Sequence, residues 1–173
     1  MVIVEDASVH SHSSMENVAV GGGLEPYAKA LFDEVMTAVP AWLERSIGAL
    51  LATPVESLDA SFRERIDSVV QRTRDDIARD LSRLLATDVD EQRTSPMHVL
   101  RRSTGGVTRL LSEMGVPPVL RDEFDASVMP DDPFALGPLT WKDLSEEVHD
   151  AGITWGAWKA ATVLQRRRSE GKA

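Results

Sequence analysis

The chain contains no cysteine, which excludes disulfide bonds, thiolate metal sites and a cysteine nucleophile. It also has no run of the roughly 18 uninterrupted apolar residues that a membrane-spanning helix requires. Its first residues include two acids and no early lysine or arginine, unlike a secretory signal peptide. We therefore expect a cytoplasmic protein without a membrane span.

Basic residues are scarce relative to acidic ones, with 19 Lys and Arg against 28 Asp and Glu and a formal net charge of −9. Because phosphate binding needs a net or local surplus of positive charge, this composition argues against nucleic acid as a partner. The negative charge is concentrated in residues 119–150, where nine acids and two bases give −7. Residues 166–172 have the opposite sign, since they hold four bases and one acid.

Apolar residues recur at steps of three and four along most of the chain after residue 23, a spacing that predicts amphipathic helices. We expect an all-α fold, an irregular bundle of about six helices, in a single domain over residues 24–168. Residues 1–23 are rich in Ser and Gly and offer little apolar area, which predicts a disordered tail. Residues 169–173 are expected to form a short basic end.

The clearest helical run starts after Asp59, a predicted N-cap, and continues to Leu85. Inside a globular protein such a stripe is usually core, but its heptad-like spacing also fits a seam between two copies, so a homodimer stays open. Before this run, a helix that opens near Glu25 is expected to end or kink at Pro40. After it, Arg93 follows three acids and is expected to pair with one of them.

Glycines and prolines divide the second half of the chain. A helical run that starts at Ser95 has Gly115 as its C-cap. The glycine pair at 105–106 inside this run predicts either a break in the helix or the close approach of another backbone. The two prolines that follow predict the opening of a short helix over residues 116–124. An irregular acidic loop with three further prolines comes next.

The last part of the chain contains two predicted helices. Thr140 and Asp143 have the spacing of a capping box at the start of the first helix. Gly152 is expected to end this helix, and Thr154 to cap the second. Three of the four tryptophans lie here, and they either anchor the helices in the core or form a partner-binding patch.

The acidic segment and its tryptophans lead to the function that we expect. An aromatic patch rimmed by acids suits a partner with a basic or amphipathic surface. The predicted function is that of a non-enzymatic adaptor or regulatory protein, which presents this surface to a partner protein. The predicted partner-binding residues are Asp131, Asp132, Phe134, Trp141, Trp155 and Trp158.

Catalytic and metal-binding motifs are missing from the sequence. The two histidines after the tail, His98 and His149, belong to no triad-like motif or metal-ligand spacing. His10 and His12 in the tail lack the further ligands that a metal site needs. We therefore assign no catalytic residue, no metal ligand and no cofactor. The alternative interpretation is a small helical enzyme or a ligand- or metal-binding protein with a pocket near Arg93, His98, Asp131 and His149.

Four stretches of the chain resemble, in the same order, a family of small uncharacterised actinobacterial proteins. They read DVDEQRTSP, GVPPVLRDEFD, PDDPFALGPLTWKDL and GITWGAWKA, and the likeness covers residues 27–165. The resemblance implies an actinobacterial, cytoplasmic protein. It implies no activity and no catalytic residue, because none is known for that family.

Overall fold

The computed structural model describes residues 23–171, and these form α-helices and short 3-10 turns without a strand among them. The elements are α1 Pro26–Leu51, η1 Val55–Ser57, α2 Ala60–Ala86, α3 Pro96–Arg102, α4 Gly105–Glu113, α5 Glu123–Val128, η2 Trp141–Asp143 and α6 Glu146–Ser169. The predicted all-α fold is confirmed. The predicted tail lies outside the described residues except for Gly23, and residues 172–173 of the predicted basic or disordered C-terminus lie outside them too, while Ser169 is the last residue of α6. None of the described helices is long and apolar enough to cross a membrane.

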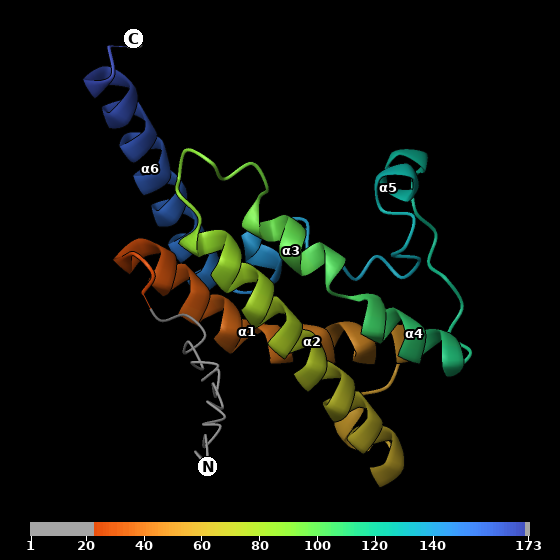
Figure 1. The fold of residues 1–173 in the computed structure, drawn as a ribbon. Helices are drawn as coiled ribbons and strands as arrows, with labels where there is room; N and C mark the ends of the chain where they lie inside the picture. The colour runs from red at the N-terminus through yellow and green to blue at the C-terminus, as the bar shows by residue number, and fades with distance from the viewer. Residues whose placement is uncertain (1–22, 172–173) are drawn as a thin grey trace, which may run out of the picture.

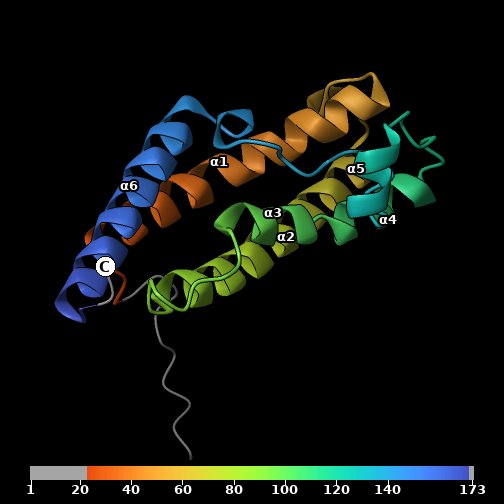
Figure 2. The ribbon, with the colours of Figure 1, turned by 90° about the horizontal axis from the view of Figure 1, so that it is seen from above.

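The bundle is built around α1, which packs against α6 on one side and α2 on the other (Figure 2). The short helices α3 and α4 follow one another along α2 (Figure 1). Buried apolar side chains from α1, α2, α3, α4 and α6 form one continuous cluster. By contrast, α5 contains no buried residue and stands apart from the bundle on long loops.

Helix α2 follows its sequence pattern closely. The carboxylate of Asp59 accepts a hydrogen bond from the backbone N–H of Phe62 at 3.1 Å, which confirms the predicted N-cap. Its buried residues are spaced by three or four and are Ile66, Val70, Thr73, Ile77, Leu81 and Leu85. Because α2 packs against α1, α3 and α4 of the same chain, this stripe is core and not a seam between copies.

The predicted end or kink of the first helix at Pro40 is wrong in part, since α1 runs without a break from Pro26 to Leu51. A proline inside a helix leaves the carbonyl four residues earlier without its backbone donor. That carbonyl belongs to Met36, and the side chain of Arg74 on α2 donates to it at 3.3 Å. A partner from another helix therefore satisfies the group that Pro40 exposes.

The second half departs further from prediction. The helical run from Ser95 does break, with α3 ending at Arg102 and α4 starting at Gly105, and Gly115 ends α4 with φ +76°. The helix predicted over residues 116–124 is absent, because α5 starts only at Glu123. Its N-cap is Asp122, which accepts from the backbone N–H of Asp125 at 2.7 Å. The prolines precede the helix and do not open it.

The last two predicted helices are one helix. The capping box of Thr140 and Asp143 is present, but it opens the 3-10 turn η2, and Ser145 caps α6. Gly152 lies inside α6, where a Cβ atom would come within 2.5 Å of the indole ring of Trp141. The glycine makes room for this ring and does not end the helix. Thr154, within α6, donates its hydroxyl to the carbonyl of Asp150 at 2.9 Å.

Candidate protein-interaction surface

Residues 119–137, which we call the α5 excursion, carry α5 away from the bundle after α4 (Figure 1). The excursion returns to the bundle in its last part, where Phe134 and Leu136 belong to the core cluster. The neck of the excursion is closed by a backbone hydrogen bond of 3.1 Å from the N–H of Val119 to the carbonyl of Pro133. Since α5 buries none of its residues, apolar packing of this helix contributes little to its position.

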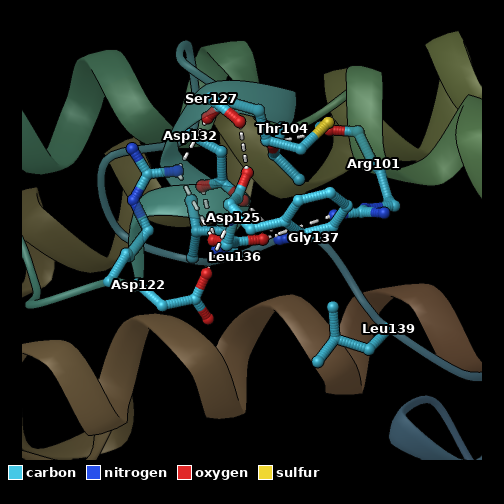
Figure 3. A network of polar contacts seen from close by, with 12 residues as sticks. Arg101, Thr104, Asp122, Asp125, Ser127, Asp132, Leu136, Gly137 and Leu139 are labelled. Carbon is cyan, nitrogen blue, oxygen red and sulfur yellow. Dashed lines mark hydrogen bonds and ion pairs between the residues drawn. The ribbon is translucent and has the colours of Figure 1, made fainter.

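Charged side chains hold α5 in place. The carboxylate of Asp125 lies 3.7 Å from the guanidinium of Arg101 on α3 and 3.6 Å from that of Arg121. Arg121 also donates to the carbonyl of Met129, which follows α5, at 2.7 Å. All three charged side chains are mostly buried, so these contacts are less screened than ordinary surface ion pairs. Figure 3 shows the network, with Arg101 from α3 and Asp125 from the excursion.

Asp132 has a structural task in the same network. Its side chain is only 5% exposed, and its two carboxylate oxygens accept hydrogen bonds from the N–H groups of Leu136 and Gly137 at 2.9 and 2.8 Å. Ala135, which lies between Asp132 and Leu136 in the chain, adopts a left-handed conformation with φ +51°. Asp132 therefore stabilises a strained turn, and its carboxylate is not available to a partner.

Large apolar side chains project from the excursion into solvent. Leu120 is fully exposed, and Phe124 and Val128 are 78% and 51% exposed. Phe124 and Val128 are four residues apart and share one side of α5. We call Leu120, Phe124 and Val128 the α5 apolar patch. The exposed acids Asp122, Glu123 and Asp131 belong to the same excursion.

The predicted partner-binding residues do not form one exposed surface. Phe134 and Trp155 are buried like Asp132, so these three side chains are not exposed to a partner. Trp141 packs on Gly152, and Trp158 packs on Tyr27 with ring centroids 5.8 Å apart. Of the six predicted partner-binding residues, Asp131 alone is exposed. The core-anchoring interpretation of the tryptophans is the better description.

The sequence prediction does not include the α5 apolar patch, because it treats residues 116–124 as an ordinary short helix of the bundle. A signal was present: α5 lies between prolines and has a single pair of apolar residues at helical spacing. Such a short pattern cannot form a stripe that spans several turns of a neighbouring helix. Apolar residues without a stripe, set among acids, indicate exposure rather than burial.

The alternative pocket is not assembled either. His98 lines a groove of about 710 Å³ between α2 and the α3–α4 corner, together with Arg102 and Arg109. Arg93 lines a separate hollow of about 380 Å³ beside the C-terminal half of α6. Neither hollow includes Asp131 or His149. Within residues 23–171, no group of three or more His, Asp or Glu side chains is placed to hold a metal ion.

Two of the three acids that precede Arg93 pair with a different arginine. Arg166 of α6 forms ion pairs with Asp88 and Asp90, the latter at 3.3 Å. The backbone N–H of Asp90 and the guanidinium of Arg166 together lower the pKa of the Asp88 carboxyl. The same carboxylates raise the pKa of Arg166. These contacts join the end of α6 to the loop after α2.

Comparisons of the chain with protein-family models, with curated proteins and with solved structures find no match. The resemblance to the actinobacterial family therefore stays a prediction. Function has to be inferred from the surfaces of the molecule.

Proposed function

We propose that this protein is a non-enzymatic adaptor or regulatory protein that uses the α5 excursion to bind a basic, amphipathic segment of a partner protein. The observation that carries the proposal is the α5 apolar patch, three large side chains that are half to fully exposed. Apolar side chains grouped on a projecting element are typical of an interaction site, because burying them in a complex is favourable. As expected from the sequence, we place this activity in the cytoplasm.

The charge of the excursion favours a basic partner. Of its five acids, Asp125 pairs with two arginines and Asp132 binds backbone N–H groups. Asp122, Glu123 and Asp131 are exposed on the same excursion, and Asp122 also caps α5. Arg121 is the sole base of the excursion, and its guanidinium is already engaged by Asp125 and Met129. A partner with lysines or arginines around an apolar stripe would complement this arrangement.

The polar network prepares the patch for binding. Arg101 connects α5 to the bundle, and the Asp132 turn orders the return of the chain. Ordering the surface before the partner arrives reduces the entropy lost on association. Because the patch consists of only three side chains, we expect a small interface and a transient complex.

Photo-crosslinking tests the proposal. A benzophenone amino acid replaces Phe124 in the full chain, and a matched probe replaces Phe62, a less exposed aromatic residue on α2. In native cells, the probe at position 124 should crosslink a defined protein through a basic amphipathic segment, whereas the probe at position 62 should not. A synthetic peptide of that segment should bind the purified chain, and Phe124→Ser should weaken binding at least tenfold, about 1.4 kcal/mol.

The charge part of the proposal has its own control. Replacing Asp122, Glu123 and Asp131 together by Asn, Gln and Asn should weaken binding of the peptide and flatten its dependence on salt. Equal crosslinking from both positions, a crosslinked segment without basic residues, or peptide binding that Phe124→Ser leaves unchanged would each contradict the proposal.

A further inference from the structure

The outer face of α6 is apolar in its middle, although nothing within residues 23–171 covers it. The residues that α6 buries are Val148, Gly152 and Trp155, which face the bundle. On the opposite side of the helix, Ile153 and Leu164 are 57% and 54% exposed. Exposed alanines lie between them, at a spacing that places all of these residues in one stripe: Ile153, Ala157, Ala160, Ala161 and Leu164.

The middle of this stripe is shaped for close contact with another helix. Its central side chains are the methyl groups of alanines, and a Cβ atom added at the neighbouring Gly156 would meet nothing within 4 Å. Small side chains in the middle and large ones at the ends allow two helices to approach along their length. In Figures 1 and 2, α6 lies at the outside of the bundle.

Charges of opposite sign continue the stripe at its two ends. Glu146 and Asp150 lie on the same side of the helix before Ile153, and Arg167 and Arg168 lie there after Leu164. Such charges also suit the dipole of a single helix, so their sign alone does not identify a partner. The positions of these charges relative to the apolar residues indicate which partner would fit the stripe.

The stripe is complementary to itself when two helices run antiparallel. If the pair is centred between Trp158 and Lys159, Ile153 of one copy faces Leu164 of the other, and Ala157 faces Ala160. In the same register, Asp150 faces Arg167. A two-fold axis produces each of these contacts twice. A parallel pair would instead place Asp150 against Asp150 and Arg167 against Arg167.

We infer that the outer face of α6 is a dimerisation surface whose occupant is the same face of a second copy, antiparallel and in this register. This surface is distinct from the α5 apolar patch and from the stripe of α2, which is core. With one short apolar stripe per copy, the interface is at the small end of the range for specific complexes, and we expect a dimer that dissociates on dilution.

Sedimentation equilibrium of the full chain over a range of concentrations measures the association. The unaltered chain should dimerise, and Leu164→Glu should weaken dimerisation at least tenfold. The matched control is Leu139→Glu, which alters an exposed leucine outside both proposed surfaces and should leave the dimer unchanged. Circular dichroism should show the same helix content in all three proteins.

Charge reversal tests the register. Asp150→Arg and Arg167→Asp should each weaken the dimer, because each places like charges opposite one another, and the double variant should restore it. The absence of native cysteine permits a second test, in which Ile153→Cys and Leu164→Cys chains are mixed and oxidised. Disulfides should join one chain of each kind in preference to two of the same kind.

Several results would overturn the inference. A chain that stays monomeric up to about 1 mM has no dimer of the expected kind. A dimer that tolerates Leu164→Glu uses another surface. Failure of the double charge variant to restore association, or disulfides between identical variants, would exclude the antiparallel register.

Discussion

The α1–α2 pair and the α5 excursion belong to the same chain but are held in place by different forces. The two long helices bury apolar stripes against each other, and even their polar contact, from Arg74 to Met36, serves to compensate a proline. The excursion reaches the core only near its end, through Phe134 and Leu136. Helix α5 itself buries no residue and is held by the contact of Asp125 with Arg101, while Phe124 and Val128 are exposed. Polar contacts therefore position the exposed apolar residues of α5, whereas apolar burial positions α1 and α2.

The largest difference between the two regions should appear on truncation of a leucine and a phenylalanine. Leu81→Ala removes a fully buried side chain from α2 and should cost about 2–5 kcal/mol of unfolding free energy. Phe124→Ala on α5 should cost less than about 0.5 kcal/mol, because its ring is exposed. Urea denaturation measures the loss of unfolding free energy in both variants. Similar losses in the two variants would mean that α5 is packed into the core.

The next effect tests whether tertiary packing explains the glycine inside α6. Gly152→Ala places a methyl group against the indole ring of Trp141 and should destabilise the protein by about 1–3 kcal/mol. Gly156→Ala is the matched control in the same helix, where nothing lies near the added atom, and it should stabilise by about 0.5–1 kcal/mol. Thermal melts of both variants compare the signs. A loss at both positions would argue for a general requirement for glycine in α6.

A smaller effect distinguishes the two neighbouring aspartates of the excursion. Asp132→Ala removes the acceptor of two backbone N–H groups and should lower stability by about 0.5–2 kcal/mol. Asp131→Ala should change stability by less than about 0.5 kcal/mol, because this side chain is exposed. Chemical denaturation separates the two. Equal stability of the two variants would contradict the structural task assigned to Asp132.

The smallest effect concerns pH and the contact between α6 and the loop after α2. The pKa of Asp88 is lowered from 3.8 in the folded chain, so its ionised form stabilises the fold at pH values above 3.8. This contribution should decrease as the pH falls below 3.8 and vanish below the folded pKa. The difference in stability between the unaltered chain and Asp88→Asn, measured from pH 7 to pH 2, should show this dependence. If the difference in stability instead grew as the pH fell, ionised Asp88 would not stabilise the fold and the prediction would be wrong.

Local patterns in the sequence predicted a large part of the fold. The N-cap at Asp59, the start of a helix at Ser95, the left-handed Gly115 after α4 and the stripe of α2 all depend on residues within a few positions of one another. Such contacts form whenever the segment is helical, so the sequence determined the helical class and the longest helix. The glycine pair at 105–106 left a break as one of two possibilities, and the structure has the break.

The tertiary structure decided the features that depend on residues far apart in the chain. Helix α1 continues through Pro40 because Arg74 reaches Met36, and α6 continues through Gly152 because Trp141 lies against it. The exposure of Phe124 likewise follows from the contact of Asp125 with Arg101 on another helix. No local pattern contains these contacts, because their partners come from other parts of the chain. A donor, a ring or a counter-ion from another element determines which conformation satisfies the polar groups and buries the apolar area.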